Sequence, residues 1–280
     1  MTAGVIDYHA PLNALVAVRG HPFDRDPLEA VFQGMAGVAA TFVDQPAAAQ
    51  LMNPDGLAPY DALVLYDMPG VDFTHADAPG YVDPPKALKT GLAAALEAGI
   101  GVVALHHAIA GSPAWGQYAE WLGGRFLYRP GPLRGAERPD SGYRHEVRHT
   151  IAREPVEAAL APILDGLPDQ FEMEDELYLF NVFEEDVAPL LRSGHAFERD
   201  GFYSAALAVK GDMFSNVGWE HPAGSNLVAW AKRAGRSPLV YAQGGDGASA
   251  YDDANYSRLV ENAIRWAASD EAMAWARARP

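Results

Sequence analysis

Short apolar runs alternate with stretches of helical spacing in the first half of the chain. Such runs, only a few residues long and rich in β-branched residues, are typical of strands that are buried on both faces. Strands that alternate with helices predict a parallel sheet with crossover helices, and therefore an α/β protein. The predicted strands are residues 14–19 (ALVAVR), 38–43 (VAATFV), 62–66 (ALVLY) and 100–105 (IGVVAL).

Two helices are indicated by the residues at their ends. Residues 84–98 begin with two prolines and stop before Gly99, which is the asymmetry that helix termini favour. Residues 113–122 stop before a Gly-Gly pair, and a loop rich in Pro, Gly and Arg follows over 126–139. The first of these helices is the expected crossover between the third and fourth strands.

The second half of the chain has a more antiparallel and mixed pattern than the first. We expect one elaborated domain over residues 13–270, with tails at 1–12 and 271–280. The segments with strand character are 145–151, 177–183, 204–210, 226–233 and 238–243, and a closing helix is predicted at 256–268.

Composition excludes several classes of function. The 280 residues, 49% of them hydrophobic, can bury a substantial core, and a net charge of −16 repels nucleic acid and anionic membrane surfaces. There is no cysteine, so the chain has no disulfide, thiolate metal site or cysteine nucleophile. The N-terminus lacks a leader pattern, and no run approaches the ~18 apolar residues that a membrane span needs. We therefore expect a cytoplasmic protein.

Polar residues follow the predicted strands where each strand ends. In an open parallel sheet the ligand lies outside the carboxyl ends of the strands, so these residues are expected on one rim. Neighbours in a strand face opposite sides, so at most one of the adjacent histidines is expected to reach the crevice. The alternatives are a core imidazole for the histidines and a plain tight turn for the glycines. The rim residues are His21, Asp67, His106, His107, Gly245 and Asp246.

An acidic segment over residues 171–178 (FEMEDELY) places four carboxylates within five positions. Mutual repulsion in such a group raises some pKa values, which suits proton transfer or the binding of a hard metal ion. Asp175 and Glu176 are the candidates for these roles. The alternative is a solvated acidic turn.

His145 and His149 stand in the sequence HEVRH, whose letters match a zinc motif. That motif requires a helix, whereas the residues on both sides indicate an extended segment. Histidines four apart in a strand share a face but are too far apart to chelate one ion easily. A zinc site here is therefore expected only if the segment is helical.

Several segments together resemble the ThuA-like family, which is associated with trehalose utilisation. The resemblance spans about residues 100–268, and Arg19-Gly20-His21-Pro22-Phe23 fits the family's first strand end. The segments that carry it are LHHA with the later GGRF, HTI at His149, GLPDQFEMEDELY over 166–178, and PLVYAQGGDG with the closing helix.

The resemblance implies a flavodoxin-like fold like that of class I glutamine amidotransferases, a three-layer sandwich with a mostly parallel central sheet. It also implies that the turn carrying an amidotransferase cysteine holds His106 and His107 here. Imidazoles cannot replace the thiolate in forming an acyl-enzyme, so glutaminase activity is excluded. Many relatives have a Gly-His pair after the last strand, where this chain has Gly245-Asp246.

The resemblance further implies a carbohydrate substrate, such as a disaccharide or an oxidised keto-sugar. Aromatic rings can stack on sugar faces, and Trp115 and Tyr178 are candidates, together with Tyr118 and Trp219. We expect substrate binding by His21, Asp67, Trp115, Tyr178 and Gly245.

The leading hypothesis is an enzyme that uses general acid/base or metal-assisted chemistry. His106 or His107 would act with Asp175, Glu176 or Asp246. A divalent metal such as zinc would bind His21, one of His106 and His107, and a carboxylate, with water completing the shell, because imidazoles favour zinc. The alternatives are a non-catalytic sugar-binding or regulatory module and a structural subunit of a larger complex. A homodimer is expected because symmetric dimers are common.

Overall fold

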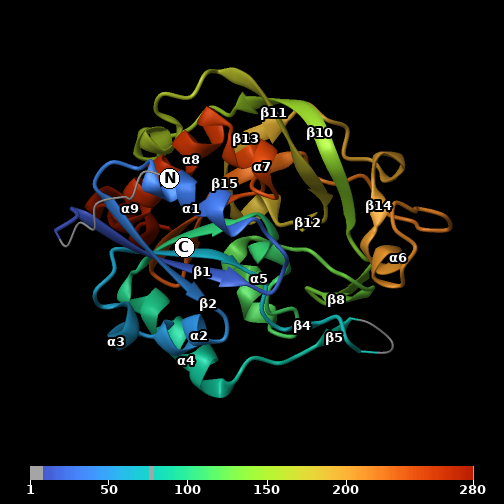
Figure 1. Ribbon diagram of the computed structural model, residues 1–280, viewed down its shortest axis with the longest axis horizontal. Helices are drawn as coiled ribbons and strands as arrows, with labels where there is room; N and C mark the ends of the chain where they lie inside the picture. The colour runs from blue at the N-terminus through green and yellow to red at the C-terminus, as the bar shows by residue number, and fades with distance from the viewer. Residues whose placement is uncertain (1–8, 76–78, 280) are drawn as a thin grey trace.

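A single ten-stranded sheet organises the molecule (Figure 1). The computed structural model describes residues 9–75 and 79–279. The strands of the main path run in the order β11-β10-β13-β15-β16-β6-β3-β1-β2, and β14 pairs with β10. The predicted α/β fold with a parallel central sheet is confirmed.

Five strands pair in parallel, and they include the four that the sequence predicts. Their side chains alternate between two cores: Val16 and Val64 lie in one, and Leu15 and Leu63 in the other. Both faces are buried in the four inner strands, which is why these read as continuous apolar runs, whereas β2 at the edge of the sheet is only half-buried. The parallel strands are β1 (Leu12–Arg19), β2 (Val38–Asp44), β3 (Ala62–Asp67), β6 (Gly101–Leu105) and β16 (Ser237–Ala242).

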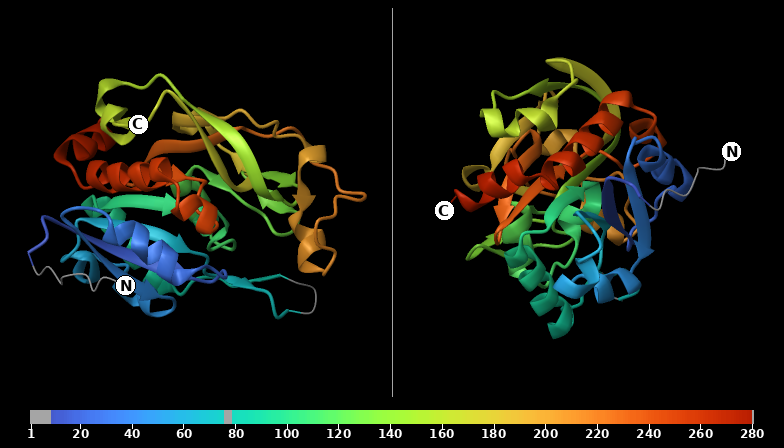
Figure 2. Two further views of the ribbon diagram at one scale, coloured as in Figure 1. Left: turned by 45° about the horizontal axis from the view of Figure 1, so that its top comes forward. Right: turned by 90° about the vertical axis from the view of Figure 1, so that its left-hand side faces the viewer.

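Helices cover the two faces of the parallel strands (Figure 2). Residues of α1 (Arg25–Gln33), α8 (Ala254–Ala267) and α9 (Asp270–Arg277) line the first core with the 3₁₀ helix η2 (Ala158–Leu164). Those of α2 (Ala47–Leu51), α3 (Pro54–Leu57), α4 (Lys86–Ala98) and α5 (Gly116–Leu122) line the second. Among the helices of the described residues, none has the length and apolar character needed to cross a bilayer.

The remaining strands of the sheet are antiparallel to their neighbours. They are β10 (Gly142–Arg153), β11 (Gln170–Leu179), β13 (Ala188–Ser193), β14 (Tyr203–Ser204) and β15 (Leu227–Ala234). Within the described residues, three two-stranded pairs complete the strands: β4 (Val71–Asp72) with β5 (Gly80–Tyr81), β7 (Gly124–Arg125) with β12 (Asn181–Val182), and β8 (Gly131–Leu133) with β9 (Ala136–Arg138).

The antiparallel half curls back over the parallel half. In the strand order, β11 is at the opposite edge from β2 and four strands away from β16. Nevertheless the backbone N–H of Tyr178 in β11 donates to the side-chain oxygen of Gln243, directly after β16, at 2.8 Å. The end of β11 therefore lies over the carboxyl ends of β6 and β16, where a ligand is expected.

Two sequence-based expectations are wrong. Residues 204–210, predicted as a strand, contain helix α6 (Ala205–Val209), which the Ser204 hydroxyl caps by accepting from the Leu207 N–H at 3.0 Å. Residues 271–280, expected as a tail, contain most of α9, and its Trp275 packs edge-on against Trp266. The expected tail at 1–12 falls largely outside the described residues, and β1 begins at Leu12.

Candidate functional site

The centre of the candidate site is the turn that follows β6. His106 begins the 3₁₀ helix η1 (His106–Ala110) and has a φ of 44°, a left-handed conformation that costs energy for a residue with a Cβ. Its ring Nδ1 donates to the Gln243 carbonyl at 2.6 Å, and its own carbonyl accepts from the Tyr241 hydroxyl at 3.0 Å. The strained backbone is thus fixed by a residue on β16 and the ring by the residue directly after that strand.

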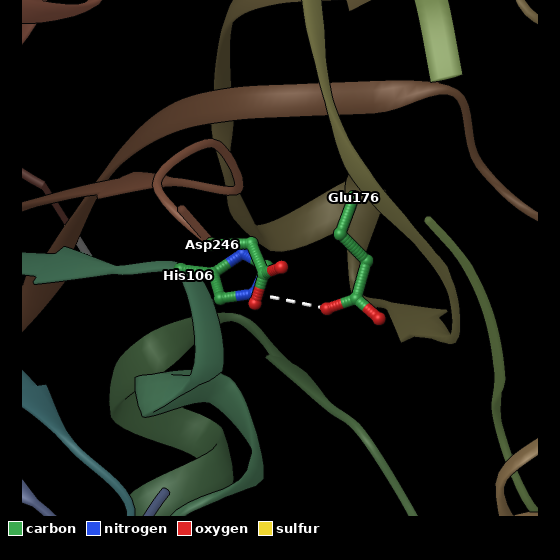
Figure 3. A group of neighbouring side chains, drawn as sticks. All are labelled: His106, Glu176 and Asp246. Atoms are coloured by element: carbon green, nitrogen blue, oxygen red, sulfur yellow. Dashed lines mark hydrogen bonds and ion pairs between the residues drawn. The ribbon is translucent and has the colours of Figure 1, made fainter. Parts of the chain in front are cut away.

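The other ring nitrogen of His106 faces two carboxylates (Figure 3). Nε2 lies 3.1 Å from Glu176 Oε2 and 3.3 Å from Asp246 Oδ1, and the Tyr178 hydroxyl is 2.7 Å from the same nitrogen. The Tyr178 ring also stacks on the imidazole, with centroids 4.6 Å apart. Three separate elements, η1, β11 and the loop after β16, therefore converge on one nitrogen atom.

A second imidazole closes the group from the opposite side. His145 Nδ1, on β10, lies 3.4 Å from Glu176 Oε1 and 3.9 Å from Asp246 Oδ2. Each carboxylate thus has one oxygen near His106 and the other near His145. His106 and Glu176 are buried, whereas the side chains of His145 and Asp246 are 40% and 27% exposed. The group opens to solvent at His145 and Asp246.

The charges of this group favour an imidazolium among carboxylates. Burial of His106 opposes its charged form, but the bonds and charges of Asp246 and Glu176 outweigh burial and raise the pKa of His106 well above its ordinary value. Burial would raise the pKa of Asp246, but the hydrogen bond and charge of His106 hold it well below the ordinary value. A buried imidazolium therefore lies beside a carboxylate that is partly open to solvent.

Asp175 has a structural position beside this group. Its Oδ2 accepts from the Gly245 N–H at 2.6 Å, and its Oδ1 accepts from the N–H groups of Glu176 and Asp246 at 2.9 and 3.2 Å. Burial raises the pKa of Asp175 to about 6, although the His106 charge and these N–H donors oppose the shift. The geometry makes Asp175 the residue that holds the Gly245-Asp246 loop in place.

Gly245 also has a structural role in this loop. Its carbonyl accepts from the Tyr66 hydroxyl at 2.7 Å, and its φ is 117°. A Cβ at this position would lie 2.3 Å from the Tyr256 hydroxyl oxygen, so only glycine fits. Gly245 therefore positions Asp246, and both of its backbone polar groups have partners within the fold.

The structure separates His107 from the His106 cluster. His107 Nε2 lies 3.0 Å from the Tyr66 carbonyl, and its ring packs against His21 and Tyr66, with centroids 4.9 and 4.4 Å away. Burial, reinforced by the charges of His106 and His21, lowers the pKa of His107 well below its ordinary value. As expected, only one of the two histidines joins the crevice group. The other is a core imidazole.

Among the described residues, a group of three possible metal ligands lies within 4.8 Å of one another, and it consists of His106, Glu176 and Asp246. The group includes one of the two adjacent histidines together with carboxylates, and neither His21 nor His107 is part of it. The Nδ1 of His21 lies instead 2.9 Å from the Pro22 carbonyl oxygen.

Asp67 and two tryptophans also lie outside the cluster. Asp67 is buried, and its Oδ2 accepts from the Gln45 side-chain amide at 2.6 Å. Trp115 lines a groove of about 770 Å³ with α4 and β15 and packs against Trp121. Trp219 is buried and donates to the Asp140 carbonyl at 3.2 Å. None of these contacts involves the cluster.

An aromatic wall stands beside His145 instead. The rings of Tyr143 and Phe214 lie 5.2 and 6.0 Å from the His145 ring, and Tyr203 is 5.6 Å from Phe214. The Phe214 N–H donates to the Tyr143 hydroxyl at 3.0 Å, and Phe214 has a φ of 59° while remaining 57% exposed. An exposed phenyl ring held in a strained conformation is a candidate sugar platform.

The sequence gives no signal for His145 as a member of this group, because its one recognisable pattern is HEVRH. As predicted, that segment is extended, within β10, and His149 instead contacts the Ser193 hydroxyl at 2.7 Å. A bulge between Arg144 and Val147 changes the local register of the strand, and it could not be seen in the sequence. Phe214, in a loop, left no sequence signal either.

Comparison with known proteins agrees with this architecture. The family model ThuA, described as trehalose utilisation, matches residues 14–267. The chain belongs to the ThuA family. None of the curated proteins matches it.

Three solved structures are similar to this ThuA protein. A ThuA-like protein from Parabacteroides merdae has a TM-score of 0.62 at 13% identity, covering 92% of this chain and 90% of its own. A ThuA-like protein from Bacteroides uniformis has a TM-score of 0.59 at 15% identity, and the match covers 95% of this chain and 94% of that one. A protein from Salmonella typhimurium, described as cytoplasmic, has a TM-score of 0.52 at 12% identity, and the match covers 91% of this chain and 99% of that one. At such identities the likeness shows the fold alone.

ThuA membership relates the protein to trehalose utilisation. Within this ThuA fold, the turn after β6 presents His106. The chain contains no cysteine, and the side chains at this turn that are able to transfer protons are the imidazole, the carboxylates and the neighbouring phenol.

Proposed function

We propose that this ThuA protein is an enzyme that moves a proton on a sugar or keto-sugar at the cluster of His106, Glu176 and Asp246. The observation that carries the proposal is the arrangement around one nitrogen atom, with His106 Nε2 3.1 Å and 3.3 Å from the two carboxylates on a strained turn. Backbone strain and buried charge both cost stability, and they are commonly retained at reactive sites.

Two groups of the cluster are placed to touch the substrate. Asp246 and His145 are partly exposed, while His106 and Glu176 lie behind them. A carboxylate at the mouth can accept a proton from a carbon or hydroxyl group of the sugar, and an imidazole beside it can donate one to an oxygen. His106 keeps Asp246 ionised, so the group that faces the mouth is a carboxylate with free lone pairs.

The proposed substrate fits the wall beside the cluster. Phe214 offers an exposed aromatic face beside His145, with Tyr143 and Tyr203 packed around it, and sugars present apolar C–H faces that stack on such a ring. A keto-sugar adds a carbonyl oxygen that needs a donor and an adjacent C–H that needs a base. The family's connection with trehalose utilisation supports a disaccharide or its keto derivative.

We also propose a cellular location and binding partners for the protein. We place the enzyme in the cytoplasm with a free small carbohydrate as its ligand, since the net charge of −16 opposes nucleic acid and anionic lipid. We also propose a homodimer, on the general frequency of symmetric dimers.

Binding and conversion of sugars can be measured separately. Trehalose, related disaccharides and their keto derivatives would be titrated calorimetrically and then followed by NMR with wild type and Asp246→Asn. We expect wild type to convert a keto-sugar and Asp246→Asn to bind it with turnover at least ~100-fold slower. Glu172→Gln is the matched control, because it also removes one charge from a side chain that is 67% exposed on β11.

The outcomes separate the two classes of function. Sugar binding without conversion in wild type would contradict the enzyme and favour a sugar-binding module. Equal turnover in Asp246→Asn and Glu172→Gln would contradict the assigned site.

A further inference from the structure

We infer that His106, Glu176 and Asp246 bind one divalent transition-metal ion, through Nε2 and one oxygen of each carboxylate. The inference rests on the proposed function only for the identity of the reactive cluster. Metal binding is measured without sugar and without turnover.

The hydrogen bonds of His106 prepare Nε2 as a ligand. Its Nδ1 lies 2.6 Å from the Gln243 carbonyl, which can only accept, so Nδ1 carries the proton. In the neutral ring Nε2 then presents its lone pair between two anionic carboxylates. A cation at this position accepts the lone pair of Nε2 and balances the negative charge of both carboxylates. The Tyr178 hydroxyl, 2.7 Å from Nε2, also bonds Glu176 and can keep that bond when the lone pair is given to a metal.

The distances agree with ligands around one ion. Zinc bonds of 2.0–2.1 Å in tetrahedral geometry place neighbouring ligand atoms about 3.3 Å apart. His106 Nε2 is 3.1 Å from Glu176 Oε2 and 3.3 Å from Asp246 Oδ1, and all three ligand atoms lie within 4.8 Å of one another. The ligands come from three elements, so the tertiary fold has already assembled the set.

Each proposed ligand side chain also has a polar partner at the atom that does not face the ion, as metal ligands usually do. The second nitrogen of His106 is bonded to a backbone carbonyl. The second oxygens of Glu176 and Asp246 lie 3.4 Å and 3.9 Å from His145 Nδ1. Asp175 fixes the backbone N–H groups of both carboxylate residues. His145 and Asp175 are therefore positioning residues for the proposed ion.

The ligand set indicates the class of metal. One imidazole with two carboxylates suits zinc or manganese, whereas magnesium prefers oxygen and water. Three protein ligands leave at least one position, on the exposed side of Asp246, for water or a sugar oxygen. That is the arrangement of a catalytic ion.

Competition with a chromogenic chelator tests the inference on the full chain after chelator treatment. Zn²⁺, Mn²⁺ and Mg²⁺ would be titrated into wild type, Asp246→Asn, His145→Gln and the charge-matched control Glu172→Gln, with circular dichroism to verify folding. We expect one equivalent of Zn²⁺ in wild type and Glu172→Gln, and much weaker Mg²⁺ binding. Zn²⁺ affinity should fall at least 100-fold in Asp246→Asn and about 10-fold or more in His145→Gln. If Asp246→Asn does not fold, the mouth variant His145→Gln carries the comparison.

Three results would overturn the inference: no Zn²⁺ binding by wild type, unchanged affinity in both site variants, or an equal loss in Glu172→Gln. Conversion of a keto-sugar by wild type that binds no Zn²⁺ would overturn the inference while leaving the proposed function intact. Zinc binding without any sugar conversion would instead contradict the proposed function alone.

Discussion

His106 Nε2 lies 3.1 Å from Glu176 Oε2, although the two residues are 70 positions apart in the chain. The contact exists because β11, at the edge of the sheet, curls over the carboxyl ends of the central strands. An edge strand thus delivers a buried carboxylate to the turn after β6. Asp175 next to it anchors the loop that brings Asp246 to the same imidazole.

The two adjacent histidines are expected to respond differently to substitution. His106→Gln removes the nitrogen that serves both carboxylates, so turnover should fall at least ~100-fold even where the variant is folded. His107→Gln removes a core imidazole and should lower stability while leaving turnover nearly unchanged. Kinetics at a temperature where circular dichroism shows both variants folded compares them, and parallel losses of activity would contradict the site.

Gly245→Ala should destabilise the protein by roughly 2–4 kcal/mol, because it adds backbone strain and a clash with the Tyr256 hydroxyl. In a Tyr256→Phe background the cost should be smaller, since the nearest clashing atom is gone. Gly247→Ala is the control, because a Cβ there meets nothing within 4 Å. Urea unfolding measures all of these variants. Equal costs at the two glycines would refute the assigned role of Gly245.

Asp67 should make stability depend on pH. Burial raises its folded-state pKa from 3.8 to about 6, with the Gln45 hydrogen bond opposing the shift, so the folded protein binds the proton more tightly than the unfolded chain. The stabilisation is fully present below pH 4 and is lost as pH rises through 6, by roughly 3 kcal/mol in total. Asp175 adds a slope of the same sign.

The difference between wild type and Asp67→Asn isolates the contribution of Asp67. Urea unfolding at several values from pH 4 to pH 7 should give a flatter dependence for the variant. Parallel curves would show that Asp67 is ionised throughout this range.

Phe214→Ala should weaken sugar binding by about fivefold, corresponding to the loss of about 1 kcal/mol of aromatic contact. Its melting temperature should change little, because the ring is 57% exposed. Val217→Ala, at a position 81% exposed, is the control and should leave affinity unaltered. Calorimetric titration distinguishes the two. A large fall in stability with unchanged affinity would make Phe214 a packing residue.

The sequence predicts the parallel half of the fold well, because strands buried on both faces leave continuous apolar runs. It also predicts the strand ends as the place for His106 and Asp246. Both predictions depend on local sequence patterns, namely apolar runs and the polar residues that directly follow them. The alanine-rich segment 204–210 was misassigned because its helix depends on the Ser204 cap more than on periodicity.

The composition of the site depends on long-range geometry that no local pattern encodes. His145 reaches Glu176 from a bulged strand, and Asp175 and Gly245 use their polar groups within the fold rather than on a ligand. The direction of the His107 ring follows from the 3₁₀ turn, which replaces the strand alternation assumed from the sequence. The family resemblance indicates which segments of the chain form the site, but it does not give the orientations of these side chains.

Proton transfer at the cluster is measured most directly by deuterium exchange. A keto derivative of trehalose would be incubated in D₂O with wild type or His106→Gln, and NMR would follow deuterium at the carbon next to the carbonyl. We expect wild type to exchange this position faster than the protein-free background, and His106→Gln to exchange at the background rate. Background exchange in wild type that demonstrably binds the sugar, or equal exchange in the two proteins, would contradict His106 as the centre of the reaction.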